Sequence, residues 1–358
     1  MRVAYFGTYE RSYPRNAQVI ACLRRADVEV LERHEGVWES TRHKWELGGR
    51  SVFRLLGAEA RLAAGGRVRG VDAVIVGYPG HLDMPLARAL SGRLPLVFNP
   101  LVSLTETLVE DRARFQRDSP AGAALRALDR LALRCADVVV ADTARSAAFL
   151  SELGGIPDER LEVCFVGAEE RLFQPLWQRR QRFHALFVGK LIPLHGLETI
   201  LEAARLAPGI PFRIVGSGQL DALLEQASGN VEHVGWVQYE QLPRELAAAG
   251  CALGIFGIGA KAQRVIPNKA FQAIACGTPL ITADTPAARE LLVNGTSALL
   301  VPPGNPEALA SALQRLAADG SLARRIGAGG RAAYEAHASE AVLGRRWRGL
   351  VERLAARS

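Results

Sequence analysis

Several loops of this 358-residue sequence combine glycine with a residue that could bind a polar ligand. Each follows a short apolar run, and they read GTYERSYPRN, GYPGHLD, NPLVSLTET, GKLIPLHG, GSGQ and GIGAKAQRVIPNK. Apolar runs of this length predict buried strands of a parallel sheet, and such sheets bind ligands beyond the carboxyl ends of their strands. Because several of these loops also carry Lys, His or Ser, together they indicate a ligand site.

One of these loops leads into a short helix that begins with a lysine. Residues 266–277 read IPNKAFQAIACG, in which Asn268 would be a good N-cap and Gly277 suits the position just past the helix end. Lys269 would then face the positive end of the helix dipole, which is unfavourable by roughly 0.3–1 kcal/mol unless an anion binds there. Free N–H groups beside a lysine predict a phosphate site. The alternative is a lysine that extends from the helix end into solvent.

Lysine is rare in this chain. The 44 basic residues include only Lys44, Lys190, Lys261 and Lys269, and three of these four lie in the loops that follow predicted strands. A compact ammonium at 190, 261 and 269 suggests positions that a planar guanidinium would not fit.

Apolar runs alternate with amphipathic stretches along the whole chain, which is the pattern of parallel sheets covered by helices. The pattern starts afresh near residue 185, so we expect an α/β protein of two Rossmann-like doubly wound domains, residues 1–172 and 173–335, with an arginine-rich linker at 171–184. The predicted strands are 3–7, 28–33, 73–78, 96–99, 138–142 and 161–167, then 185–190, 212–218, 231–236, 251–257, 279–284 and 298–302.

The composition is that of a globular protein, with 49% hydrophobic and 23% charged residues. No segment approaches the ~20 apolar residues of a membrane span, and the first apolar stretch is too short for a signal peptide, so we expect a cytoplasmic protein. Five cysteines in apolar runs, without CxxC spacing, predict buried thiols in a reducing compartment. A net charge of +7 favours anionic substrates or a lipid surface, but the dispersed arginines do not indicate nucleic-acid binding.

An ordered series of motifs resembles the retaining glycosyltransferases of family 4, which have the GT-B fold. The motifs are FVGKLIPLHGLETILEAARL, FRIVGSG, VEHVGW and IPNKAFQAIACGTPLITADTPAARELL, preceded by the weaker matches CADVVVADTARSAAFL and LEVCFVGAEERLFQP. The resemblance implies a C-terminal domain that binds a nucleotide-diphosphate sugar and an N-terminal domain that holds the acceptor across a cleft. It also implies that a C-terminal helix at 336–358 packs back on the N-terminal domain.

On the donor side, the resemblance assigns contacts to the nucleotide sugar. Lys190 matches the family's basic residue after the first glycine of the second domain. His195 stands where a second lysine is common, either as a phosphate contact or as a structural histidine. The complete predicted donor-binding set is Gly7, Gly189, Lys190, His195, Gly216, Gly218, Gly235, Lys261, Arg264, Asn268, Lys269 and Gln272.

Two positions depart from the family's pattern of a Glu, seven residues and a second Glu, because Arg264 and Gln272 stand there instead. Gln272 can still accept a hydrogen bond from one ribose hydroxyl, although without the charge of a carboxylate. Arg264 cannot copy the Glu that meets the sugar, which permits a donor carrying an anionic or otherwise unusual group.

In the N-terminal domain, Gly7 ends the first predicted strand and would approach the diphosphate from the opposite wall. His81 in GYPGHLD resembles the cleft histidine of many relatives, or it is a loop histidine bonded to backbone. The residues predicted for the acceptor side are Tyr9, Arg15, Asn16, Asn99 and Ser103.

The resemblance implies transfer of a sugar from a UDP- or GDP-linked donor to a hydroxyl of a sugar, lipid-linked or small-molecule acceptor, with retention at the anomeric carbon. Fixed cations and helix N–H groups would stabilise the departing diphosphate, so no metal or other cofactor is expected, and Lys190, His195 and His81 would lie nearest the reaction. The sequence has no DxD-type pair, cysteine cluster or histidine pair at ligand spacing.

Three other functions fit parts of the sequence. A GT-B nucleotide-sugar epimerase would need cleft carboxylates, for which there are few candidates. A non-catalytic nucleotide-sugar-binding partner subunit is favoured by the missing Glu pair. A NAD-dependent oxidoreductase is disfavoured because GTYERS offers one glycine where G-x-G-x-x-G is expected.

The C-terminal stretch EAVLGRRWRGLVERLAARS has one apolar helical stripe, with arginines over the remainder. The stripe would pack on the N-terminal domain. The basic surface could touch anionic lipid, so peripheral attachment at the inner membrane face is a second expectation.

Overall fold

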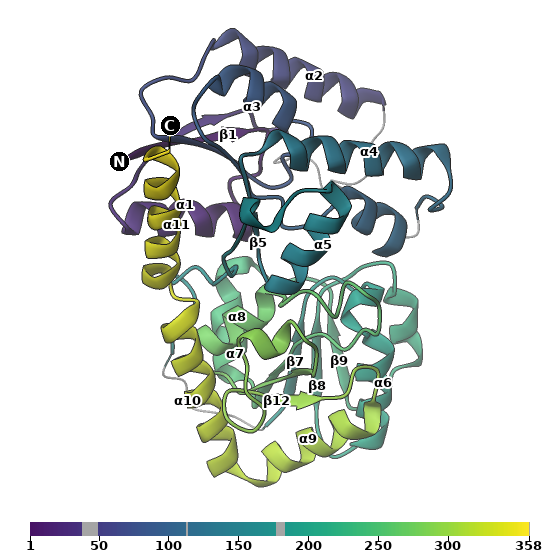
Figure 1. The fold of residues 1–358 in the computed structure, drawn as a ribbon. Coiled ribbons are helices and arrows are strands. Elements are labelled where there is room, and N and C mark those ends of the chain that lie inside the picture. Colours follow the sequence, from purple (N-terminus) through teal and green to yellow (C-terminus); the bar gives the residue numbers. More distant parts are fainter. Residues whose placement is uncertain (38–48, 112–113, 177–182, 358) are drawn as a thin grey trace. The chain divides into compact units, whose positions relative to one another are not determined.

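The computed structural model describes residues 1–37, 49–111, 114–176 and 183–357, which form two compact units (Figure 1). Unit 1 comprises Met1–Val166 and Glu340–Ser358, and unit 2 comprises Gly167–Ser339. The sequence analysis placed these divisions at 172/173 and 335/336. Lys44 and residues 177–182 of the predicted linker lie outside the described residues.

Unit 1 contains a parallel six-stranded sheet in the order β2-β1-β3-β4-β5-β6. The central strands β3, β4 and β5 consist of Ala, Val, Ile, Leu and Phe and are fully buried, as expected for a sheet covered on both faces. The strands are β1 (Arg2–Gly7), β2 (Glu29–His34), β3 (Ala73–Val76), β4 (Leu96–Phe98), β5 (Val138–Ala141) and β6 (Leu161–Val163).

Six α-helices cover this sheet, and the last of them comes from the end of the chain. Trp347 and Val351 of this last helix, α11, are buried, and α11 packs on α1 (Figure 1). A Cβ on Gly344 would lie 2.4 Å from the Cys22 carbonyl oxygen, so glycine permits the close approach. The helices are α1 (Pro14–Arg25), α2 (Gly49–Ala64), α3 (Met84–Ser91), α4 (Pro120–Cys135), α5 (Ala144–Gly154) and α11 (Glu340–Ala355), with short helices η1 (Glu106–Asp111) and η2 (Asp158–Arg160).

Unit 2 contains a second parallel six-stranded sheet, in the order β12-β11-β10-β7-β8-β9. This is the strand order of dinucleotide-binding Rossmann domains, in which the order reverses between the first and fourth strands, here β7 and β10. The strands are β7 (Ala185–Val188), β8 (Phe212–Val215), β9 (Val231–Val234), β10 (Cys251–Leu253), β11 (Leu280–Ala283) and β12 (Leu299–Val301).

The helices of unit 2 complete its two outer layers. A core formed by strands β7, β8, β10, β11 and β12 with helices α6, α9 and α10 includes the fully buried Phe187, Leu313 and Ile326. The helices are α6 (Leu197–Leu206), α7 (Leu242–Ala248), α8 (Asn268–Ala275), α9 (Pro306–Ala318) and α10 (Gly320–His337), with short helices η3 (Pro193–His195), η4 (Asp221–Gln226), η5 (Tyr239–Gln241) and η6 (Ala288–Glu290).

The predicted α/β fold class is confirmed, and each of the twelve predicted strands contains an observed strand. Two local predictions were wrong. Asn268 is the first residue of α8 rather than its N-cap, because the chain turns at Pro267 and no side chain caps the helix. Cys135 is only half-buried, whereas the other four cysteines are buried as expected. Within the described residues, no helix is both long and apolar enough to cross a membrane.

Candidate functional site

The loops after β7 and β10 meet where the strand order of unit 2 reverses, which is where ligands of such sheets bind. The Phe256 N–H after β10 donates to the His195 carbonyl after β7 at 3.1 Å. Gly196, with a φ of +68°, makes this contact possible, since a Cβ there would lie 2.6 Å from the Phe256 carbonyl carbon. The two loops therefore form one surface.

Two glycines of the predicted donor set bring the ends of β7 and β8 together. Gly216 has a φ of +136°, and a Cβ there would lie 1.9 Å from the Gly189 carbonyl oxygen. Gly189 has a φ of +148°, and its Cβ would lie 2.8 Å from Lys269 Nζ. Any side chain at these positions would displace backbone or the lysine, so the glycines leave room for the Lys269 amine at the strand ends.

Lys269 does not extend into solvent, so the alternative of a solvent-directed lysine was wrong. Although the residue as a whole is partly exposed, its Nζ is buried and has no hydrogen-bond partner among the described residues. The Nζ lies 3.7 Å from the centroid of the Phe187 ring, which supplies a cation–π contact but no hydrogen bond. Burial lowers the pKa of Lys269 well below its ordinary value. A buried amine without a partner is costly, and an anion would compensate it.

His195 faces the same amine. Its Nδ1 bonds to the Lys190 carbonyl, which can only accept, so Nδ1 carries the proton and a neutral ring keeps a lone pair on Nε2. Burial lowers the pKa of His195 well below its ordinary value, and the positive charges of Lys269, Lys261 and Lys190 lower it further. A neutral His195 therefore accepts at Nε2 rather than donating to a phosphate, which favours the structural reading of this histidine.

The structure brings these three lysines of the predicted donor set together, since their charges all act on His195. Lys261 and Arg264 lie in one turn of the loop after β10, where the Arg264 N–H donates to the Lys261 carbonyl at 3.0 Å.

The remaining members of the donor set differ in how they are placed. Gly218 packs on the β7 loop, because a Cβ there would lie 2.5 Å from the Leu191 carbonyl oxygen. Gly235 is exposed with open space around it. Asn268 begins α8, and Gln272, one turn later, is buried with its Nε2 donating to the Tyr239 hydroxyl at 3.2 Å.

In unit 1 the loops after β1 and β3 meet in a similar way. The Asp83 carboxylate accepts from the Thr8 N–H at 2.8 Å and from the Thr8 hydroxyl at 2.9 Å. A Cβ on Gly7 would lie 2.3 Å from Asp83 Oδ2, so glycine is needed there. Burial and the neighbouring Asp83 raise the pKa of Glu59 to about 9. Glu59 is therefore protonated near pH 7 and can share its proton with Asp83.

His81 is buried in unit 1, with Nε2 3.3 Å from Asp129 Oδ1 and its ring edge-on to Phe98. Asp129 also accepts from the backbone N–H groups of Leu104 and Thr105, each at 2.9 Å. Burial lowers the pKa of His81. These contacts give His81 a role in holding the loop after β4, while its contact with substrate stays a prediction.

All five residues predicted for the acceptor side are buried and hydrogen-bonded inside unit 1. Arg15 Nε donates to Asn99 Oδ1 at 2.9 Å, and Arg15 Nη1 donates to the Phe165 carbonyl at 2.9 Å. The other polar contacts join Tyr9 to Glu32, Asn16 to Tyr5 and Tyr78, and Ser103 to the Glu106 N–H. In this structure these side chains hold the strand-end loops in place, and an acceptor role for them stays a prediction.

Sequence reasoning missed three residues of unit 2 that shape the site. Phe187 lies under the Lys269 amine, and its place two residues before Gly189 in FVGK was a usable signal. Tyr239 and Glu169 adjoin Gln272, but nothing in the spacing of these residues along the chain points to the contact.

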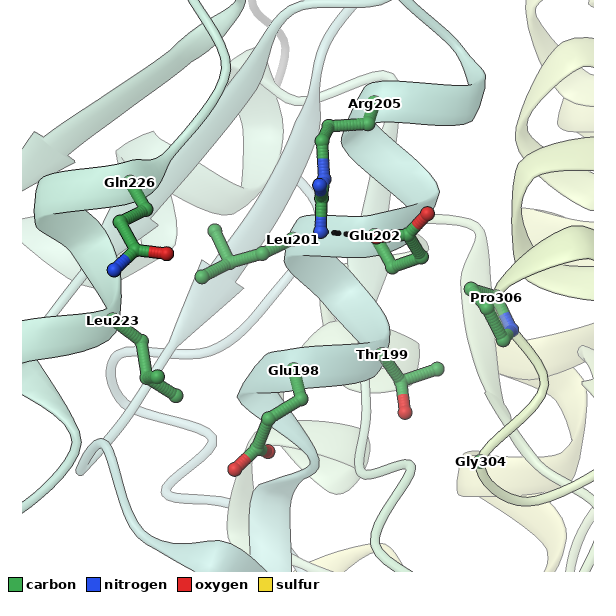
Figure 2. Close-up of a pocket in the computed structure, with 9 residues that line it drawn as sticks. All are labelled: Glu198, Thr199, Leu201, Glu202, Arg205, Leu223, Gln226, Gly304 and Pro306. Carbon is green, nitrogen blue, oxygen red and sulfur yellow. Dashed lines mark ion pairs between the residues drawn. The ribbon is translucent and has the colours of Figure 1, made fainter.

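A hollow of about 370 Å³ lies elsewhere on unit 2, between α6, η4 and the loop before α9 (Figure 2). Figure 2 shows Glu198 and Glu202 on its α6 side, with Glu202 paired to Arg205. Its carboxylates do not suit a phosphate group. Among the described residues, no three His, Cys, Asp or Glu side chains are grouped to hold a metal ion.

Two family profiles match the chain in succession. Residues 9–167 match the glycosyl transferase 4-like domain, and residues 182–319 match glycosyl transferases group 1. Together the matches cover most of unit 1 and of unit 2.

Individual relatives are more distant. A D-inositol 3-phosphate glycosyltransferase of Rhodococcus erythropolis is 29% identical over 242 residues, which are 61% of this chain and 54% of that protein. A protein of the same name from Nocardia farcinica is 29% identical over 280 residues, 70% of this chain and 62% of that protein. The chain thus spans between about half and two thirds of the length of these curated relatives.

Solved structures share the fold across the whole chain. A sucrose-phosphate synthase from Thermosynechococcus elongatus has a TM-score of 0.76 at 18% identity and covers 100% of both chains. Anabaena Alr3699/HepE in complex with UDP-glucose has a TM-score of 0.71 at 16% identity, covering 99% of this chain and 100% of that one. At these identities the likeness concerns the fold.

Proposed function

Since the chain belongs to family 4 of the group 1 glycosyltransferases, we propose that it transfers a sugar from a nucleotide-diphosphate sugar to an acceptor hydroxyl. Unit 2 would bind the donor. Relatives named for inositol phosphate, phosphatidylinositol and lipopolysaccharide core glycosylation suggest an acceptor from glycolipid or glycan biosynthesis.

The observation that carries the proposal is the buried Lys269 amine. It lies at the start of α8, beside the reversal point of a Rossmann-type sheet, with no hydrogen-bond partner among the described residues. Lys190 and Lys261 add positive charge around the same place, and the first N–H groups of α8 lack a side-chain cap. A diphosphate would neutralise the amine and accept from those N–H groups.

We propose that the reaction retains the anomeric configuration and needs no metal. Loss of the nucleoside diphosphate places negative charge on the leaving oxygen, and the lysines with the α8 N–H groups are fixed where that charge would develop. This arrangement supplies the role that a divalent cation would otherwise have.

The first experiment is a thermal-shift titration in EDTA with UDP, GDP, ADP and dTDP. UDP and GDP are the first choices because HepE was solved with UDP-glucose and a relative from Corynebacterium glutamicum is named as GDP-mannose-dependent. One nucleotide should stabilise the wild type and Arg315→Met, which removes an exposed cation on α9. The same nucleotide should not stabilise Lys269→Met.

The nucleotide identified in this way would then be supplied as its sugar conjugates with candidate acceptors, and the product linkage read by NMR. Product with inverted configuration would refute retention, and a requirement for added Mg²⁺ or Mn²⁺ would refute metal independence. Binding without transfer or donor hydrolysis would favour a non-catalytic partner subunit, to which the replacement of the Glu pair by Arg264 and Gln272 also points.

A further inference from the structure

The amide of Gln272 is held from one side by a tyrosine. Gln272 lies in the second turn of α8, and its Nε2 donates to the hydroxyl of Tyr239, the first residue of η5, at 3.2 Å. The Tyr239 ring packs edge-on against Phe173, with centroids 5.5 Å apart. Both ends of the hydrogen bond are therefore fixed by packing.

A buried carboxylate decides the direction of this hydrogen bond. Glu169 lies beside the Tyr239 hydroxyl and accepts its hydrogen bond, and Arg171 Nη2 lies 3.0 Å from Glu169 Oε2. A tyrosine hydroxyl has one hydrogen, and an ionised carboxylate can only accept it. The Tyr239 oxygen is then left as an acceptor, so the NH₂ group of Gln272 points toward it and the carbonyl oxygen points away.

We propose that Tyr239 and Glu169 are positioning residues that orient the Gln272 amide so that its carbonyl oxygen accepts from a ribose hydroxyl of the donor nucleotide. The inference rests on the proposed function. It adds two residues to the donor site, and it predicts a preference for ribonucleotides over deoxyribonucleotides.

The same chain of hydrogen bonds explains why an amide can stand at 272 in place of the family's carboxylate. A glutamate there would compete with Glu169 for the single hydrogen of Tyr239, and one of the two carboxylates would face an oxygen lone pair. Glutamine removes this conflict because it donates to Tyr239 and still offers one acceptor oxygen. The residues at 169 and 272 are therefore coupled through Tyr239.

The test compares UDP with 2′-deoxy-UDP and 3′-deoxy-UDP, and the corresponding GDP series, by calorimetry. For the base that binds, wild type should prefer the ribonucleotide over one deoxy form by roughly 3- to 10-fold, the value of one hydrogen bond. Tyr239→Phe should bring this ratio close to one and leave the affinity for that deoxy form unchanged. Tyr334→Phe is the matched control, because it removes the hydroxyl of another tyrosine of unit 2, which bonds to the Ala168 carbonyl.

Exchanging the acid and the amide tests the coupling. Gln272→Glu should weaken ribonucleotide binding, and adding Glu169→Gln should restore it, because the new amide at 169 can donate to Tyr239 while Tyr239 donates to the new carboxylate at 272. An unchanged ratio in a folded Tyr239→Phe, or a double variant no better than Gln272→Glu, would overturn the inference while leaving the proposed function standing. If Tyr239→Phe does not fold, the double variant decides. If wild type binds neither series, the proposed function fails and this inference fails with it.

Discussion

Lys269 holds a buried amine for which the described residues offer no hydrogen-bond partner, so the unliganded protein bears a cost that a ligand would remove. Methionine has a similar length and is apolar, and it would pack on the Phe187 ring without that cost. We therefore expect Lys269→Met to stabilise the unliganded protein by about 1–3 kcal/mol, the usual penalty of an unsatisfied buried group. Thermal unfolding without nucleotide measures this. A lower melting temperature than wild type would show that the amine has a compensating partner.

The same lysine should make nucleotide binding depend on pH. Burial lowers the pKa of the free Lys269 amine, and a bound diphosphate should raise it, so binding takes up protons when the pH lies between these two values. Affinity should be highest below the lower pKa and fall as the pH rises toward the upper one. Calorimetry in two buffers of different ionisation enthalpy measures the uptake, which Lys269→Met should abolish. Proton release on binding would contradict this assignment.

At the scale of the element, the loop after β7 depends on glycine. Alanine at 189 would strain a backbone with a φ of +148° and place its Cβ 2.8 Å from Lys269 Nζ. We expect Gly189→Ala to cost about 1–3 kcal/mol of stability and to abolish nucleotide binding by displacing the amine. Gly209→Ala is the control, since no atom lies within 4 Å of its Cβ position. Normal nucleotide affinity in Gly189→Ala would mean that the amine does not contact the ligand.

The elements could be predicted from the sequence because their signals are local. Short apolar runs ending in glycine, such as ALFVG at 185–189, mark buried strands, and their alternation with helices gives the two sheets. The fate of Arg15 could not be predicted in this way. Its partners Asn99 and Phe165 lie 84 and 150 residues away along the chain, so only the folded sheet shows that its guanidinium is enclosed. Tyr239 and Gln272, 33 residues apart, were missed for the same reason.

At the scale of the whole molecule, the chain passes between the units twice, after Val166 and after Ser339. Unit 1 is therefore complete only when the last 19 residues, Glu340–Ser358, have joined it. Trp347 is the largest fully buried side chain of α11, which packs on α1. The stability of unit 1 should thus depend on the end of the chain, while unit 2 has a separate core.

Trp347→Ala tests this dependence. Removing the buried indole should cost about 3–5 kcal/mol, and the loss should fall on unit 1. Hydrogen exchange followed by mass spectrometry should show faster exchange in α1 and β1, with exchange in α8 and β7 unchanged and nucleotide-induced protection of α8 retained. Arg345→Ala, at an exposed position of the same helix, should change neither unit. Faster exchange throughout unit 2 in Trp347→Ala would show that the two cores unfold together, so that donor binding depends on the C-terminal helix as well.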